Sequence, residues 1–557
     1  MTSKGDYMTR RSANPYYVNM KKKRTGTIKG LLMSLFATVI FAIVADYLSL
    51  PAYNIHSIET LFLFAFYFGL FAFLSVFFTG KFTKFAFGSL TVAGVIVGFV
   101  IVMSLLGSEI LNADAFRNQI NLTESGNFSD DFNLVSYDKI PIVDYETAKQ
   151  LGDKQMGKIQ GLGSQYNINL DYTLISVLDN VYRVSPLDYQ DLFKWFENKG
   201  EGIPGYVKVN VRDVNDVSLV TLDKGMIYSP SAFFDQDLLR HVRFTYRTEI
   251  LDDFSFEIDN SGHPYYVISI IEPKIGFFSG WDAQGVIVVD SVTGEMNKYD
   301  LTSIPSWVDR VQPVSLAWFQ VDNWGYYVHG WFNTIFGRKD VIQTTDGFNY
   351  ISIEGQTYVF SGMTSAGADQ SIVGFSLINL KTKAAYFYRV GGADENSAMS
   401  SAQGAVQHLG YVSTFPVLLN VEGEPSYFMS LKDQEGLVKM FALVSVTDYS
   451  VVGVGTTLVE AKADYIKKLI AAGILESAVE LEKSVSGVVT KIASAISGGD
   501  TQYYITLEGD THLYVVPFDL SPETVLTQVG DTVNIHYYES TEKTIPAITF
   551  DNSAYDY

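Results

Sequence analysis

Residues 28–50 read IKGLLMSLFATVIFAIVADYLSL, residues 60–79 read TLFLFAFYFGLFAFLSVFFT, and residues 85–106 read FAFGSLTVAGVIVGFVIVMSLL. Each stretch has about 20 residues or more, enough for a helix to cross the ~30 Å hydrocarbon core of a bilayer. Backbone polar groups find no water there, so we expect three transmembrane helices within 28–107. The remaining 450 residues contain no comparable stretch, which predicts one large body on an N-terminal membrane anchor.

Basic residues determine the predicted orientation of this anchor. Eight Lys and Arg lie in residues 1–29, none lies in the loop 54–59, and Lys81 and Lys84 lie between the second and third spans. Loops rich in Lys and Arg stay in the cytoplasm. Residues 1–27 are therefore expected to be a cytoplasmic basic tail, and the body to lie outside the cytoplasm. The lipid bilayer is the first predicted partner.

The body is strongly acidic, and the whole chain lacks cysteine. Residues 1–107 hold ten Lys and Arg against three Asp and Glu, which leaves 30 basic and 58 acidic residues in the body. Such a surface repels nucleic acid, so no nucleic-acid partner is expected. The lack of cysteine excludes thiol catalysis and thiolate zinc sites. We interpret an exported body without disulfides as a protein of a Gram-positive bacterium.

Beyond the spans, the sequence divides into segments of different patterning. Residues 108–143 are polar and weakly periodic, and are expected to form a stalk. Residues 144–260 combine a helical pattern with alternating apolar strands, which predicts an α+β unit. Residues 484–557 contain about five short strands, which predicts a small closed β-barrel of the oligonucleotide/oligosaccharide-binding (OB) type.

Residues 261–483 contain a degenerate internal repeat. Its three copies begin at Gly262, Gly355 and Gly423, and each is interpreted as strand, loop, strand, tight turn, strand. Helical patterns follow the second copy, over 397–409, and the third copy, over 456–474. Because a hairpin sheet needs a cover for its apolar face, the body is expected to be a stack of antiparallel-sheet-plus-helix units of the α+β class.

The first copy carries a resemblance to a known family. An aromatic-rich strand over 262–267 is followed by Gly285, an apolar strand ending in Asp290, and Thr293-Gly294-Glu295. This order resembles the strand part of PepSY-type domains, and the degenerate copies at 355–388 and 423–449 share the resemblance. It implies binding or inhibitory modules of bacterial envelope and secreted proteins. It assigns no functional residue to this chain.

Catalytic and metal-binding motifs are missing from the sequence. There is no HExxH, GxSxG, P-loop or GxGxxG motif, and the seven histidines form no i, i+4 pair. No catalytic residue, metal or cofactor is therefore expected.

An aromatic cluster is the first candidate site. Five of the six tryptophans lie within 281–331. Aromatic faces with amide and carboxyl groups nearby can bind sugars, and a large aromatic core between two repeat units would explain the same cluster. The candidate ligand or partner surface consists of Trp281, Trp307, Trp318, Trp324, Tyr326, Tyr327 and Trp331.

A basic cluster in the acidic body is the second candidate site. Arg240, Arg243 and Arg247 can bind an anion such as a phosphate group. The alternative is that these arginines pair with nearby acidic side chains: Asp235, Asp237, Asp252 and Asp253.

Together these features predict a membrane-anchored, extracytoplasmic binding or scaffold protein of a bacterial cell envelope, with no catalytic activity. An envelope protein or a wall polymer is the expected partner of the body, and a homo-oligomer remains open. Two alternatives stand beside this hypothesis. One is an extracytoplasmic enzyme that acts on cell-wall polymer through carboxylates converging from separate units. The other is a component of a larger phage- or plasmid-encoded membrane assembly.

Overall fold

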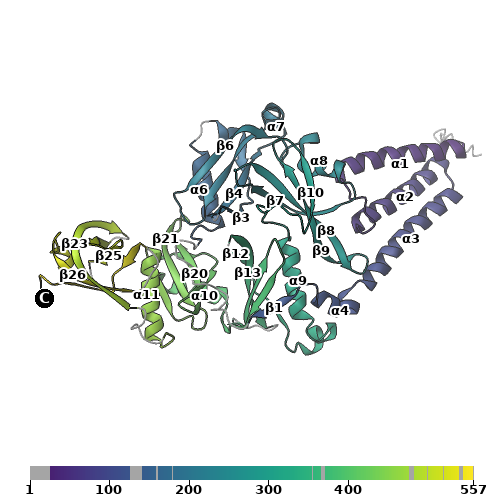
Figure 1. Ribbon diagram of the computed structural model, residues 1–557. Coiled ribbons are helices and arrows are strands. Elements are labelled where there is room, and N and C mark those ends of the chain that lie inside the picture. Colours follow the sequence, from purple (N-terminus) through teal and green to yellow (C-terminus); the bar gives the residue numbers. More distant parts are fainter. Residues whose placement is uncertain are drawn as a thin grey trace, which may run out of the picture. The chain divides into compact units, whose positions relative to one another are not determined.

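The computed structural model describes residues 26–125, 141–158, 161–178, 180–353, 355–365, 371–475, 482–497, 500–518, 520–538 and 543–555. The chain divides into two compact units, residues 1–102 and residues 103–557. Figure 1 labels the elements, from the purple helices near the N-terminus to the yellow strands near the C-terminus.

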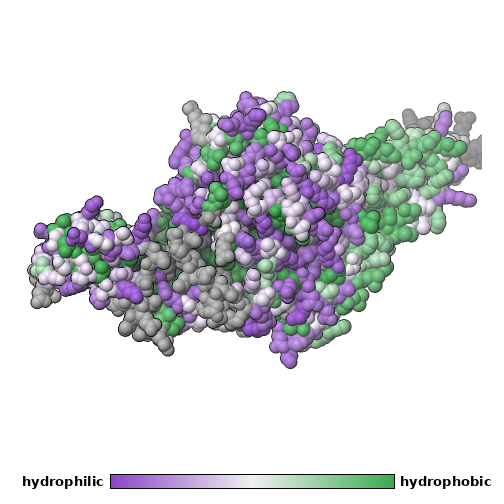
Figure 2. Space-filling view, viewed as in Figure 1, coloured by the Kyte–Doolittle hydropathy of each residue, from purple (hydrophilic) through white to green (hydrophobic). Residues whose placement is uncertain are grey.

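Three long helices dominate the N-terminal part of the chain: α1 (Thr27–Ser49), α2 (Ile58–Thr79) and α3 (Lys84–Leu106). All three are long and apolar enough to cross a membrane, and Figure 2 shows hydrophobic residues along them. Helix α1 packs on α2 at Gly30, where an added Cβ would lie 2.8 Å from Thr79 Cγ2. The predicted apolar helices are confirmed and are compatible with a membrane anchor.

Sheet one begins the body with five antiparallel strands. They are β2 (Tyr166–Ile168), β3 (Thr173–Val177), β4 (Asn180–Tyr189), β5 (Ile203–Asn210) and β6 (Val217–Met226). Strand β3 pairs with the first half of β4 and strand β2 with its last residues. Strand β4 also pairs with β5, and β5 pairs with β6. Helix α6 (Tyr145–Met156) precedes this sheet and packs on it at Gly152, where a side chain would collide with the Tyr172 hydroxyl. The connections contain η2 (Leu162–Ser164) and α7 (Leu192–Asn198).

Sheet two has four antiparallel strands in chain order: β7 (Ile250–Ile258), β8 (Pro264–Ile275), β9 (Ser279–Asp290) and β10 (Met296–Asp300). The short η3 (Phe234–Gln236) and helix α8 (Leu238–Thr245) precede it. Sheets one and two share a single core, in which Val184 and Val207 lie with Phe256, Ile268 and Leu238. Because every second strand residue faces this core, the two sheets cover each other's apolar faces.

Sheet three has six strands: β11 (Ile342–Thr344), β12 (Asn349–Ile353), β13 (Gln356–Ser365), β15 (Gly374–Asn379), β16 (Ala385–Tyr388) and the parallel edge strand β1 (Leu122–Ser125). Strands β14 (Ser371–Ile372) and β17 (Gly392–Ala393), which precede β15 and follow β16 in the sequence, form a small sheet of their own. Helix α9 (Val314–Tyr326) covers one face, where Ala317 and Val321 pack with Val359 and Phe387. The π-helical turn η4 (Asn333–Gly337) follows α9, and α4 (Glu109–Arg117) packs on α9 through Phe116.

Sheet four has five antiparallel strands: β18 (Val412–Ser413), β19 (Val417–Val421), β20 (Glu424–Lys432), β21 (Val438–Ser445) and β22 (Val452–Gly455). Three helical segments accompany it: α10 (Glu395–Ala405), η5 (Gln407–Leu409) and α11 (Leu458–Ala471). Sheets three and four share a second large core, in which Phe360 and Phe375 lie with Tyr427, Leu443 and Ala398 of α10.

The C-terminal sheet has six strands: β23 (Glu482–Ser497), β24 (Asp500–Leu507), β25 (Leu513–Pro517), β26 (Thr532–Tyr538), β27 (Thr544–Pro546) and β28 (Thr549–Asn552), with η6 (Pro522–Val525) between β25 and β26. The long β23 pairs with both β24 and β26, while β27 runs parallel to β25 and β28 pairs with β26. The N–H groups of Ala547 and Ile548 donate to Val515 and His536. Residues 547 and 548 therefore bond to β25 and to β26, which lie on opposite sides of β23 and β24 in the sheet, and these strands share one core.

The predicted α+β class is confirmed, and the structure adds where each helix packs. In sheets one, two and four the strands follow chain order, whereas in sheet three β1, the first strand in the chain, pairs with the last strand, β16. Helices α6 and α9 precede the sheets on which they pack, while sheet four packs against α10, which precedes it, and α11, which follows it. Helix α10 follows the second predicted copy but packs on sheet four, because Ala398 and Ala402 face that sheet's core. The expected boundary at 260/261 falls between the paired strands β7 and β8, and the one at 483/484 falls within β23.

The segment expected to be a stalk contains regular structure where it is described. Its residues 109–125 include α4 and β1, and β1 pairs with β16 from Leu122 to Ser125. Polar side chains alone did not reveal this strand, because pairing with a sheet edge satisfies its backbone groups. Residues 126–140 of the expected stalk and residues 1–25 of the expected tail lie outside the described residues.

An ion pair joins the helix of sheet one to sheet four. Asp144 caps α6 by accepting from the Thr147 N–H (3.1 Å), and it accepts from Lys432 Nζ at 2.6 and 2.8 Å. Burial disfavours the ionised Asp144, but Lys432 outweighs that effect and holds the pKa of Asp144 below its ordinary value. The pair therefore stabilises the contact between sheets that are far apart in sequence.

Asp144→Asn should lower the free energy of unfolding by about 2 kcal/mol at pH 7, because an amide keeps the helix cap but leaves Lys432 without its counter-charge. The difference should persist above about pH 3.9, the ordinary pKa of Asp, and shrink at lower pH, because the pKa in the folded chain lies lower still. Thermal unfolding of the full chain in detergent measures it. The matched control is Glu197→Gln, which removes an exposed pair with Lys194 (3.9 Å). Equal stability of Asp144→Asn and wild type would contradict the assignment.

Candidate functional site

A cleft of about 470 Å³ opens where sheets one, two and three meet. Sheet one contributes Arg183, sheet two contributes Asp253, sheet three contributes Tyr350, and the connection before α9 contributes Arg310. This volume suits a ligand of the size of one or two sugar units. We call this space the cleft; its other lining residues used below are Asp144, Asp171 and Phe348.

Arg183 reaches the cleft from the middle of β4. It pairs with Leu174 of β3 and Val209 of β5, and only 7% of it is exposed. Its Nε donates to the Val143 carbonyl at 3.4 Å. Burial lowers the pKa of Arg183 to about 10, against the opposing effect of Asp144. A guanidinium group held this far from water favours an anion that enters the cleft.

Arg310 enters the same cleft from the connection between sheet two and α9. It is also only 7% exposed, it lies 4.3 Å from the centre of the Tyr350 ring, and its Nη1 donates to the Tyr350 hydroxyl (3.2 Å). Its Nε is buried without a hydrogen-bond partner. Within the described part of the chain, neither arginine forms an ion pair with a carboxylate. Two buried cations thus keep donor groups for a ligand.

A buried carboxylate fixes the backbone that carries Arg310. Glu257 of β7 is fully buried; it accepts from the N–H groups of Asp309 (2.8 Å) and Arg310 (3.1 Å) and from the Ser255 hydroxyl (2.9 Å). Asp309 in turn accepts from the Ser176 N–H of sheet one at 2.5 Å. Burial, reinforced by the charge of Asp309, raises the pKa of Glu257. The loop is therefore tied to both sheets before Arg310 reaches the cleft.

Asp253 occupies an irregular position at the edge of the cleft. The pairing of β7 with β8 shifts register between Asp252 and Phe254, and the Asp253 backbone has φ 44°. A bulge with a left-handed residue costs conformational energy and redirects a side chain, and such positions gather at functional sites. Burial raises the pKa of Asp253, against the opposing effect of Arg310.

Carboxylates and aromatic rings complete the lining. Asp171 and Asp144 lie in the cleft with Asp253, and Phe348 and Tyr350 contact each other edge to face (5.6 Å). Arginines bind phosphate or carboxylate groups, carboxylates accept from hydroxyl groups, and aromatic faces stack on sugar rings. The cleft therefore combines the groups needed to bind an anionic, hydroxyl-rich molecule.

The structure separates the aromatic residues of the predicted surface. Trp307 lies against Tyr265 of sheet two (4.8 Å between ring centroids), and Trp324 contacts Phe387 of sheet three (5.4 Å). Trp318 contacts Phe348, a residue of the cleft (5.7 Å). The remaining members lie as follows: Tyr326 donates to Gln343, Tyr327 is half-buried, and Trp331 contacts Phe332. Of the tryptophans, Trp318 is the one with a ring contact to the cleft.

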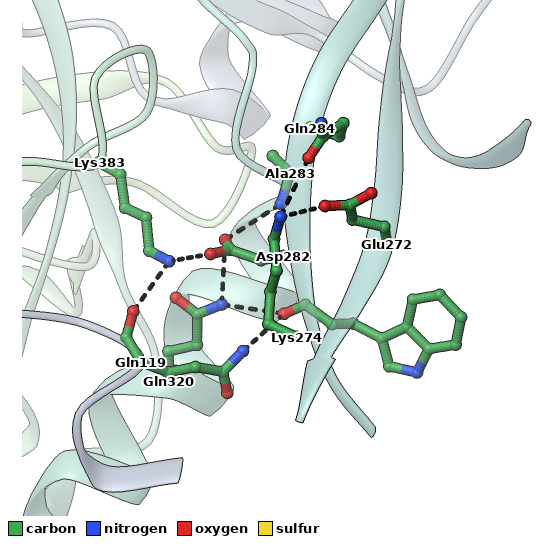
Figure 3. A network of polar contacts seen from close by, with 9 residues as sticks. Gln119, Glu272, Lys274, Asp282, Ala283, Gln284, Gln320 and Lys383 are labelled. Carbon is green, nitrogen blue, oxygen red and sulfur yellow. Dashed lines mark hydrogen bonds and ion pairs between the residues drawn. The ribbon is translucent and has the colours of Figure 1, made fainter. Parts of the chain in front are cut away.

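A polar network lies at Trp281, the first member of that surface, and Figure 3 shows its residues Gln119, Asp282, Gln320 and Lys383. Lys383 forms an ion pair with Asp282 (2.6 Å) and donates to the Gln119 carbonyl (3.0 Å). The side-chain amides of Gln119 and Gln320 both donate to the Trp281 carbonyl, at 3.1 and 3.0 Å. The backbone of Trp281 thus belongs to a junction of sheet two with α9 and sheet three.

The predicted arginine cluster lies on and beside α8 and contacts backbone carbonyls. Arg243 is buried and donates to the carbonyls of Tyr246 and Glu249, at 3.2 and 2.5 Å. Arg240 donates to the Phe234 carbonyl, and the exposed Arg247 to the Phe244 carbonyl. These contacts hold the end of α8. Arg247 leaves the largest part of its side chain to solvent.

Sequence reasoning missed Arg183 and Arg310, although each carried a signal. Arg183 occupies an alternating apolar strand, and Arg310 lies between the buried Val308 and Val311. A charged residue in an apolar pattern is either paired or functional. In the described part of the chain, no group of three or more His, Asp or Glu side chains is placed to hold a metal ion.

No protein-family model and no curated protein sequence matches this chain. Among solved structures, two complexes of a Trypanosoma rangeli sialidase are similar. The complex with 2,3-difluorosialic acid, a covalent intermediate, has a TM-score of 0.17 at 10% identity, and the match covers 70% of this chain and 53% of that chain. The complex with 2,3-difluoro-KDN has a TM-score of 0.14 at 9% identity and the same coverage. The chain thus spans about half of the sialidase, and likenesses this weak carry no argument about fold or activity.

Glu257→Gln should change how stability depends on pH. The raised pKa means that folding retains a proton on Glu257, so the wild type should lose stability as pH rises above about 4.3, the ordinary pKa of Glu. This loss amounts to at most about 1.4 kcal/mol per pH unit per group. Thermal unfolding of the full chain from about pH 5 to about pH 8 should show a shallower decline for Glu257→Gln. The control Glu435→Gln, at an exposed position, should follow the wild type, and parallel curves for all three proteins would refute the assignment.

Proposed function

We propose that this protein is a membrane-anchored binding protein of a bacterial cell envelope, whose body binds an anionic, hydroxyl-rich molecule in the cleft. The observation that carries this proposal is the pair of buried arginines, Arg183 and Arg310, which line one cleft without forming an ion pair in the described part of the chain. The charges of Asp144 and Asp253 act on these arginines without an ion pair in the described residues, and an anionic ligand would supply a charged acceptor in direct contact with the guanidinium groups.

The remaining lining supports a carbohydrate or polyol polymer more than a simple ion. The carboxylates of Asp171 and Asp253 would repel a compact polyanion, but they accept hydrogen bonds from hydroxyl groups. Tyr350 and Phe348 offer ring faces at the same place. A wall polymer that carries one phosphate or carboxylate per unit fits this combination.

The location follows from the anchor. In this proposal residues 1–27 are cytoplasmic and the body is outside, because the basic residues lie before the first span and between the second and third. The lack of cysteine is the basis for placing the protein in a Gram-positive envelope.

The body would be a series of binding modules. Antiparallel sheets packed with helices, with the strands in chain order in sheets one, two and four, support units of one type, and the resemblance of 262–299 is to PepSY-type modules. The strand order of the C-terminal sheet, with β23 paired on both sides and β27 parallel to β25, supports a terminal OB-like barrel.

An enzyme that acts on wall polymer is the second candidate. This candidate is favoured because Asp171, from the connection between β2 and β3, and Asp253 of sheet two line the same cleft. Hydrolysis of glycosidic bonds uses two carboxyl groups, one of them with a raised pKa, and burial raises that of Asp253.

Binding of defined polymers by the full chain in nanodiscs tests the first function. We expect poly(glycerol phosphate) or polygalacturonate to bind, and neutral dextran not to bind. Arg310→Lys keeps the charge but loses the planar fork of donors, so affinity should fall about tenfold, as expected for one charge-assisted hydrogen bond. The control is Arg247→Met, which removes an exposed arginine of the α8 cluster.

The outcomes separate the hypotheses. Weaker binding by Arg247→Met and unchanged binding by Arg310→Lys would move the site to α8, and no binding of either anionic polymer would contradict the proposal. Release of sugar products by the wild type, lost in Asp253→Asn, would favour the enzyme.

A further inference from the structure

An exposed apolar turn follows α9. In residues 331–337, which include η4, Phe332 is 64% exposed, Ile335 49% and Phe336 80%. The rings of Phe332 and Phe336 stack, with centroids 6.4 Å apart and planes 15° from parallel. Two stacked, exposed phenylalanine rings and an exposed isoleucine within one short turn indicate a contact with an apolar partner.

The turn is held in this shape by its own hydrogen bonds. The Arg338 N–H donates to the Asn333 carbonyl (2.6 Å), and the Asn333 side chain both accepts from the Lys339 N–H (3.2 Å) and donates to the Lys339 carbonyl (2.9 Å). Thr334 donates to the Trp331 carbonyl (2.7 Å). Hydrogen bonds within the turn therefore hold Phe332 and Phe336 in exposed positions.

The turn lies near the point where the chain leaves the last apolar helix. Helix α4 begins at Glu109, three residues after α3 ends, and packs on α9, with Phe116 and Phe319 in edge-to-face contact at 6.4 Å. Burial, together with the carboxylate of Glu109, raises the pKa of Tyr327 to about 12. Tyr327 thus lies near the start of α4, four residues before the exposed turn.

Two further features agree with a lipid surface. On α4, Ile110 is 49% and Leu111 63% exposed, so apolar side chains also lie exposed directly after the last span. The exposed Arg338 and Lys339 follow the turn at once, and cations beside an apolar face are attracted to anionic headgroups. The neighbouring Asp340 is engaged by His329 at 2.9 Å.

We propose that residues 331–337 insert Phe332, Ile335 and Phe336 into the interface of the membrane that holds α1–α3. This inference rests on the membrane anchoring of the proposed function. An apolar face of this kind lies about 5–10 Å deep, at the boundary of headgroups and acyl chains. A second contact with the bilayer would restrict how the body tilts on its anchor and so fix the direction in which the cleft faces.

Single-cysteine labelling tests this inference, because the chain contains no cysteine of its own. The full-length variants Phe336→Cys, Phe193→Cys and Val95→Cys carry an environment-sensitive fluorophore in nanodiscs of phosphatidylcholine and phosphatidylglycerol. Lipids with a nitroxide near the headgroup or deep in the acyl chain then quench labels at the matching depth. Phe193 of α7 is 76% exposed and serves as the matched control on the body, and Val95 of α3 reports on the anchor.

We expect the shallow nitroxide to quench the label at position 336, the deep nitroxide to quench the label at position 95, and neither to quench the label at position 193. Quenching at 95 without quenching at 336 overturns the inference and leaves the anchor intact. A label at 336 that shifts to the blue without lipid quenching also overturns it, because a second copy or another protein then covers the turn. A label at 95 that no lipid quenches refutes the anchor itself.

Discussion

The buried Glu257 carboxylate is the contact on which the centre of the body depends. It accepts two backbone N–H groups from the segment that leads to α9, and Asp309 of that segment accepts from sheet one. One fully buried carboxyl group thus determines where sheet two, sheet one and the α9 connection meet. The same contact brings Arg310 into the cleft. A buried polar group in this position finds its hydrogen-bond partners only in the folded arrangement, so it also specifies that arrangement.

The body is built as paired layers because each sheet needs cover for its apolar faces. A sheet has two faces, and one helix covers at most one of them. Sheets one and two cover each other, and sheets three and four share a second core. Helix α9 covers the remaining face of sheet three. The paired sheets are neighbours in the chain, and the ion pair of Asp144 with Lys432 links one pair to the other across a long distance in sequence.

The proposed membrane contacts and the proposed binding in the cleft support each other. A ligand that is part of a wall polymer is fixed in space, so a cleft on a freely tilting body would meet it in many orientations. An anchor of three apolar helices, together with an apolar turn at the bilayer surface, would reduce that freedom. Preorganisation of this kind lowers the entropy lost on binding.

The sequence by itself determined the three apolar helices, because about 20 consecutive apolar residues satisfy their backbone only as a helix in a bilayer. It also determined the strand–turn–strand segments at 262–299, 355–388 and 423–449, since alternation and turn residues are local signals. It did not determine that β1 completes sheet three, or that α10 packs on sheet four, because edge pairing and helix docking depend on distant partners. Only the tertiary structure brought Arg183 of β4 and Arg310 into one cleft, because packing between separate sheets produces no repeating pattern of residues in the sequence of either segment.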